Sequence, residues 1–171
     1  MRALVFDTQL PDGPRRWAIG CSAIVELLPV VSWRPVSGSP PWTLGLFERK
    51  RLLMPLIDLS VRLGGPPAAL RLGSRILLVY LAPERADAGS PVGRLAGLGG
   101  LLVESMLGLE TIDWTTDGAH AGFACALDSP FGPLVSHDGT TVQLLHTERL
   151  LNGDERALLF PESGRSAALA E

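Results

Sequence analysis

The sequence predicts an all-β fold made of many short strands, and three observations lead to this prediction. Of the 171 residues, 46% are hydrophobic and 19% are charged, which provides enough apolar surface for a packed core. The 19 glycines and 14 prolines interrupt the apolar runs and leave little room for long helices. Most apolar runs are about four to eight residues long, the usual length of a buried strand. A chain of this length forms one domain, or two small β subdomains that share an interior.

The N-terminal part of the sequence predicts a hairpin, a third strand and a connection. Apolar residues at 3–6 and 17–19 flank a stretch of turn-forming residues, so the two runs are expected to pair as a hairpin. Residues 22–28 continue as a strand until a proline ends it. The proline-rich residues 31–41 are expected to form an extended surface connection rather than a packed element.

A second hairpin, with a basic end, is predicted over residues 42–59. Apolar runs at 42–47 and 52–59 flank the charged tip Glu48–Arg51. The second run is compatible with a strand or a helix, but Pro55 argues against the helix. Proline also lacks a backbone N–H, so this strand is expected to be an edge strand or a bulged one. Residues 60–63, followed by two glycines, predict one helical turn.

The remaining strands are expected between residues 75 and 145. The run at 75–81 is rich in β-branched and other apolar residues and predicts a strand. Residues 95–109 contain scattered glycines that would weaken a helix, so we expect one strongly twisted or bulged strand there. A polar loop is expected at 83–91, a hairpin turn at 136–139, and further strands at 123–127, 132–135 and 141–145.

The C-terminal residues predict a short helix and a tail. Asn152 is a preferred helix cap, and Glu155 stands three places later, as in a capping box. The helix is expected to reach Leu159 and to stop before Pro161. Residues 161–171 are expected to be a flexible tail.

A weak internal repeat links the two halves of the chain. Residues 46–63 and 134–151 superpose at a constant offset of 88, which aligns Asp58 with His146. Both segments have the order strand, tip, strand, short helix. Leucine-rich segments can produce such a match by chance, but we favour a duplication, which predicts two similar β subdomains.

Composition excludes several classes of function. The net charge of −3 and the pI of about 5.6 do not fit a general nucleic-acid binder. The N-terminus lacks the apolar stretch of a signal peptide, and no apolar run reaches the roughly 20 residues of a membrane span. Cys21 and Cys125 have no CxxC spacing and are expected to be reduced thiols, although a disulfide remains the alternative. We expect a cytoplasmic protein without membrane insertion.

The sequence contains no motif for catalysis or for a cofactor. His120, His137 and His146 have neither HxxxH spacing nor neighbouring cysteines, so we expect structural histidines and no metal. The glycines at 93–100 lack the GK[ST] ending of a phosphate-binding loop. No GxSxG elbow is present either. We therefore expect no enzyme activity, no catalytic residues and no cofactor.

Four blocks of the sequence match, in order and spacing, the motifs of one known family. The blocks and the motifs that they match are Ile24–Leu27 with V-x-E-I, Gly45–Leu59 with G-x-x-N-x-R-G-x-x-x-P-V-I-D-L, Gly100–Ser105 with G-L-x-V-D-x, and Glu148–Asn152 with E-K-L-L-N. Each block is weak alone, but together they are fairly specific. By these blocks the chain resembles the CheW-like chemotaxis coupling proteins, with residues 1–160 as a single CheW-like domain.

The resemblance implies a fold, a role and partners. The fold would be two SH3-like β-barrel subdomains that share a hydrophobic interior, with short helical turns and a short C-terminal helix. The role would be that of a non-catalytic adaptor. Its partners would be the regulatory domain of a CheA-type histidine kinase and the cytoplasmic tip of a methyl-accepting receptor, in cytoplasmic arrays at the membrane. By motif position, the expected partner-binding residues are Ile24, Glu26, Gly45, Glu48, Lys50 and Arg51.

The tip departs from the family motif. Lys50 stands on the signature arginine and Arg51 on the signature glycine. Lysine does not reproduce the bidentate contacts of arginine, and arginine lacks the conformational freedom of glycine. These changes indicate a divergent coupling protein for a dedicated pathway, such as surface sensing or pilus control. The alternative is a free β-barrel ligand-binding or regulatory module that has lost its place in an array.

Overall fold

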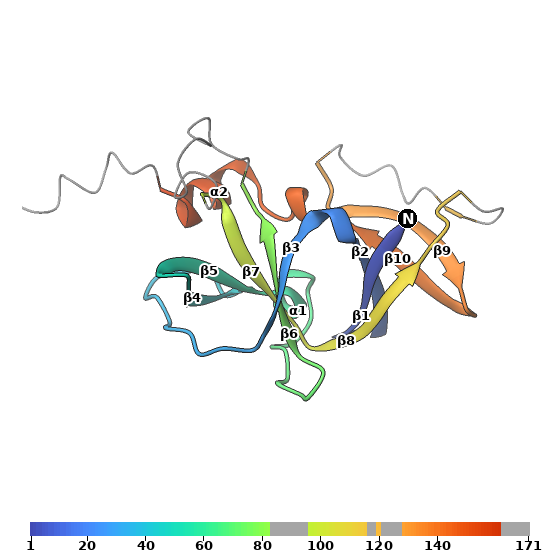
Figure 1. Cartoon of the computed structure of the whole chain (residues 1–171), viewed down its shortest axis with the longest axis horizontal. Coiled ribbons are helices and arrows are strands. Elements are labelled where there is room, and N and C mark those ends of the chain that lie inside the picture. The colour runs from blue at the N-terminus through green and yellow to red at the C-terminus, as the bar shows by residue number, and fades with distance from the viewer. Residues whose placement is uncertain (83–95, 116–118, 121–127, 162–171) are drawn as a thin grey trace, which may run out of the picture.

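Two five-stranded sheets make up most of the protein (Figure 1). The structure, a computed structural model, describes residues 1–82, 96–115, 119–120 and 128–161. Within this part of the chain one sheet has the strand order β8-β1-β2-β10-β9 and the other β3-β6-β7-β5-β4. The strands are β1 (Arg2–Leu10), β2 (Gly13–Gly20), β3 (Ile24–Pro29), β4 (Thr43–Arg49), β5 (Leu52–Asp58), β6 (Arg75–Tyr80), β7 (Leu98–Val103), β8 (Ser105–Thr111), β9 (Phe131–His137) and β10 (Thr140–Leu145).

Short helical elements follow some of these strands. They are η1 (Cys21–Ala23), α1 (Leu59–Arg62), η3 (Thr147–Arg149) and α2 (Gly153–Leu159). The predicted turn after residue 59 is α1, and Gly64, with a φ of 95°, follows its C-cap residue Leu63. The predicted C-terminal helix is α2, and Asn152 and Glu155 form its capping box. No helix in the described residues is long and apolar enough to cross a membrane.

The two sheets repeat one topology. In each, a hairpin (β4–β5 or β9–β10) places its second strand parallel to a strand of a second antiparallel pair (β6–β7 or β1–β2). The hairpins match at the offset found in the sequence, because Asp58 and His146 are the cap residues of α1 and η3. Strands β3 to β7 thus correspond in order to β8, β9, β10, β1 and β2. The N-terminal hairpin completes the sheet formed by the later strands.

The largest core cluster lies between the sheets. It combines residues of the first sheet, such as Phe6 and Ile19, with residues of the second, such as Leu77 and Leu101, all fully buried. Leu150 and Leu151, after η3, belong to the same cluster. A smaller cluster fills the β3–β7 half, and another lies on the other half. The predicted all-β fold of two subdomains with a shared interior is confirmed.

The prediction of one strand over residues 95–109 was wrong. The chain divides at Glu104, so β7 belongs to one sheet and β8 to the other. All of β7 is buried, whereas burial alternates along β8. Glu104 is held at this change of sheet, because its carbonyl accepts a hydrogen bond from the Ser74 hydroxyl (2.8 Å) and its carboxylate pairs with Arg71 (2.9 Å).

The prediction that Pro55 marks an edge or bulged strand was also wrong. Strand β5 lies between β7 and β4, and the irregularity falls on β4, between Thr43 and Gly45. Leu46, which faces Pro55, exchanges its own backbone hydrogen bonds with Arg34 at 2.8 and 2.9 Å. Pro55 is therefore not required to donate to β4. Pairing with β7 begins one residue later, at Leu56.

The connection at residues 31–41 is more closely packed than predicted. It contains turns at 37–38 and 41–42, Trp33 packs against the core of the β3–β7 half, and Arg34 forms a bridge with Leu46. Three further predictions lie wholly or almost wholly outside the described residues: the loop at 83–91, the strand at 123–127 and the tail at 161–171, of which the structure describes Pro161.

Candidate partner-binding site

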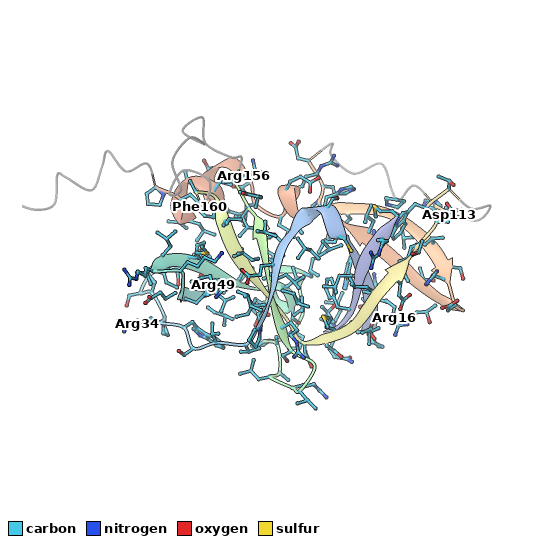
Figure 2. All side chains as sticks on the ribbon, in the orientation of Figure 1. Arg16, Arg34, Arg49, Asp113, Arg156 and Phe160 are labelled. Atoms are coloured by element: carbon cyan, nitrogen blue, oxygen red, sulfur yellow. The ribbon has the colours of Figure 1, made fainter. Side chains whose placement is uncertain are left out.

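Five of the six predicted partner-binding residues lie on β3 or on the tip of the β4–β5 hairpin. Strands β3 and β4 are the two edges of one sheet. The chain brings these edges together through an ion pair between Glu26 on β3 and Arg49 on β4. Figure 2 shows Arg49 in this half of the molecule, while Arg16 lies in the other half. We call the ion pair and the hairpin tip the β3/β4 site.

The ion pair is bidentate. Nη2 of Arg49 donates to one carboxylate oxygen of Glu26, and Nε donates to the other at 3.3 Å. About a third of each side chain is exposed, 36% for Arg49 and 33% for Glu26. The hydrogen bonds from Arg49 lower the pKa of Glu26, and the charges of Arg49 and Lys50 add to this effect while partial burial opposes it. Glu26 is thus ionised at neutral pH, and a partner meets a carboxylate that is already paired.

The tip of the hairpin carries surplus positive charge. Lys50 and Arg51 form the two-residue turn, with φ values of 51° and 64°. Such turns normally use glycine or asparagine, because a left-handed backbone crowds other side chains. Lys50, Arg51 and Glu48 are all exposed. Since Glu26 balances Arg49, Lys50 and Arg51 outweigh Glu48 at the tip.

Apolar side chains are exposed on the same sheet, and sequence reasoning did not single them out. On β3, Val25 is 50% exposed and Leu27 is 43% exposed. On β5, Leu53 is 64% exposed. Alternation along β3 was the available signal, because Val25 and Leu27 point away from the buried Leu28. Exposed apolar residues on an edge strand are typical of a surface that pairs with another protein.

Two predicted residues are explained by the fold itself. Ile24 is half-buried and packs against the core cluster between the sheets. Gly45 is buried with a φ of 133°, and a Cβ there would lie 2.0 Å from the carbonyl oxygen of Arg34. Glycine is therefore required at this position whatever binds the protein. As partner contacts, both residues stay predictions.

One side chain that holds the site together was missed. The family motif directs attention to Lys50, but Arg49 makes the contact with Glu26.

Cys21, expected to be a reduced thiol, is a free cysteine here. Cys125 lies outside the described residues.

Comparisons with known proteins agree with this architecture. A family model described as the CheW-like domain matches residues 12–155. Among solved structures, the chain is similar to the scaffolding protein TtCheW from Thermoanaerobacter tengcongensis, with 19% sequence identity and a TM-score of 0.67. The alignment covers 90% of this chain and 95% of that chain. No curated protein sequence matches.

Proposed function

Because the chain belongs to the CheW-like domain family, we propose that it is a non-catalytic adaptor that couples chemoreceptors to a CheA-type histidine kinase. The match of the family model to residues 12–155 carries this proposal, since it spans most of both halves. The adaptor acts in the cytoplasm, at receptor arrays beneath the membrane. Residues 1–160 work as one domain, and its two halves present different surfaces to different partners.

The β3/β4 site supports an adaptor role because it combines an ion pair, positive charge and exposed apolar surface. The ion pair between Glu26 and Arg49 connects the two edges of the sheet. Lys50 and Arg51 offer positive charge, and Val25 and Leu27 offer apolar surface on the adjoining edge strand. Apolar contacts supply most binding energy in such interfaces, while charges select the partner and speed the encounter. A partner with an acidic rim and an apolar centre fits this surface.

Charge reversal at Lys50 tests the proposal. We expect Lys50→Glu to weaken binding of the kinase regulatory domain, or of the receptor tip, by about tenfold or more, which is about 1.4 kcal/mol. Binding of both partners is measured by isothermal titration calorimetry. Thermal unfolding is recorded alongside, because Lys50 is exposed and its reversal should leave folding intact.

Arg15→Glu is the matched control. Arg15 is an exposed arginine of the β1–β2 hairpin, in the other sheet, and its side chain pairs with Asp12. This reversal changes the net charge by the same amount at a different surface. If the two variants bind alike, the contact lies elsewhere on the molecule. If the wild-type protein binds neither partner, the coupling role itself is wrong.

The altered tip favours one other function, that of a free β-barrel regulatory or ligand-binding module outside any array. Lysine and arginine stand where the family has arginine and glycine, so the shape of the contact differs. Fluorescence imaging of the tagged protein separates the two functions. An adaptor forms clusters that disappear when the receptors are deleted, whereas a free module stays diffuse in both strains.

A further inference from the structure

The other sheet has its own link between edge strands, with different chemistry. Glu110 on β8 and His137 at the end of β9 join the two edges of this sheet, with 2.8 Å between Oε2 and Nε2. His137 is the counterpart of Arg49, 88 residues further along the chain. Asp138, the counterpart of Lys50, follows in the turn, and its Oδ2 lies 3.8 Å from the same Nε2. A single imidazole nitrogen thus faces two carboxylates.

The spacing of these atoms fits a small metal ion. One ligand atom from each of Glu110, His137 and Asp138 lies within 4.8 Å of the others. Tetrahedral zinc with ligands at about 2.0–2.2 Å places those ligand atoms roughly 3.3 Å apart. That separation falls between the two measured here, 2.8 and 3.8 Å. The Asp138 side chain is 90% exposed, so no surrounding packing opposes a shift of its carboxylate toward the ligand position.

The charges around the two links differ in sign. Arg49 and the nearby Lys50 surround the single carboxylate of Glu26 with positive charge. The second link instead combines two carboxylates with one imidazole. The negative charge of Glu110 also acts on Arg16. The Arg16 guanidinium, however, donates its hydrogen bonds to Asp7, at 2.8 and 3.0 Å. These hydrogen bonds raise the pKa of Arg16, and the charge of Glu110 adds to the rise. The second link therefore carries an excess of negative charge, which a divalent cation would neutralise.

We propose that Glu110, His137 and Asp138 bind a divalent transition-metal ion, with zinc as the best fit. The metal ion takes the place of the proton on Nε2, and water completes its coordination. An imidazole ligand favours zinc, nickel or copper over magnesium or calcium, which prefer oxygen ligands. The bound ion would connect β8 to β9. It would so stabilise this half of the molecule, in which no arginine of the described residues joins the two edge strands as Arg49 does in the other half. The spacing of histidines in the sequence did not reveal this site, because Glu110 comes from a distant strand.

Calorimetric titration of the full chain with zinc chloride tests the site. We expect saturable binding of one zinc ion, a rise in the unfolding midpoint, and no comparable effect of magnesium. His137→Gln and Glu110→Gln should each weaken zinc binding at least tenfold while the circular dichroism spectrum stays unchanged. Measurements are repeated in a Cys21→Ser, Cys125→Ser background, so that thiols do not contribute.

His146→Gln is the matched control. His146 also lies near a glutamate, 3.4 Å from Glu148, but it is not part of the three-ligand cluster. Its substitution should leave zinc affinity within twofold of the parent. The proposal is overturned if the cysteine-free protein shows no saturable zinc binding. It is also overturned if His137→Gln binds zinc as tightly as His146→Gln.

Discussion

Glu26 stabilises the fold through an ion pair and is also part of the exposed surface. Its carboxylate closes the β3–β7 half by pairing with Arg49, yet a third of the side chain is open to solvent. Because Arg49 lowers the pKa of Glu26, the folded state holds this proton less tightly than the unfolded chain does. The ion pair therefore stabilises the protein fully above the ordinary glutamate pKa of about 4.3. This contribution is lost as the pH falls through the lower pKa of the folded state.

We predict that Glu26→Gln destabilises the protein at pH 7, by less than about 1 kcal/mol because the pair is partly exposed. The difference from wild type should shrink at pH 3, where the unfolded chain binds the proton that the folded state resists. Urea unfolding at the two pH values measures this. Glu48→Gln, which removes an exposed carboxylate of the same hairpin, provides the baseline. A destabilisation by Glu26→Gln that is equal at both pH values would contradict the linkage.

Single residues of the site were predictable only where a motif marked them. Glu26 and Lys50 were predicted from their positions in the motif blocks, and both lie at the β3/β4 site. Arg49 was missed because its contact spans 23 residues and depends on the two edges of a sheet meeting. No local pattern in the sequence carries that information. Gly45 was predicted as a partner contact, which stays a prediction, and the structure shows only that it closely approaches Arg34.

At the scale of elements, the β4–β5 and β9–β10 hairpins form the same kind of tight turn with different residues. Both have two-residue turns with positive φ, at Lys50 and Arg51 in one and at Asp138 and Gly139 in the other. Asp-Gly suits such a turn, whereas Lys-Arg does not. The β4–β5 turn is therefore strained, and its two cations are held outward at a cost in stability.

We predict that Arg51→Gly stabilises the protein by about 1 kcal/mol, because glycine adopts a positive φ without steric strain. Gly139→Ala should destabilise it by a similar amount. A Cβ at Gly139 would meet no atom within 4 Å, so only backbone strain is introduced there. Urea unfolding of both variants tests the pair, with Arg51→Ala as the control that removes the charge but keeps the strain. Equal stability of Arg51→Gly and Arg51→Ala would show that the turn is not strained.

Strands and helices were predicted well where local turn or cap residues mark their ends. They were predicted poorly where their bounds or positions depend on contacts with distant parts of the chain. The Asp138–Gly139 turn and the Asn152 cap are local signals, and both predictions were confirmed. The division at Glu104 was missed, because an apolar run does not show that the chain passes from one sheet to the other. Pro55 was misplaced because its tolerance in a central strand depends on the hydrogen bonds of Leu46 with Arg34.

At the scale of the whole molecule, the shared core should make the two halves unfold together. We predict that Leu77→Ala, in the cluster between the sheets, lowers the free energy of unfolding by about 2–5 kcal/mol. Hydrogen exchange should show the same loss for the slowest amides of β6, which contains Leu77, and of β1 in the other sheet. Protection that falls in β6 and persists in β1 would mean that the halves unfold separately.

The global fold was predictable because several kinds of signal agreed. Short apolar runs indicated strands, the repeat indicated two halves, and the ordered blocks indicated the family. The sequence alone did not show that the first hairpin joins the later strands. That arrangement depends on the parallel pairing of β2 with β10, which links distant parts of the chain.

The strand order has a consequence for synthesis on the ribosome. Strands β3 to β7 follow one another between residues 24 and 103, so this sheet is complete once that stretch has emerged. The other sheet needs β1 and β2, which emerge before that stretch, and β8, β9 and β10, which emerge after it. The first hairpin must therefore wait for the strands that pair with it, although its core residues Phe6 and Ile19 can pack on β6 and β7 earlier. The half that carries the β3/β4 site is the first that can form during translation.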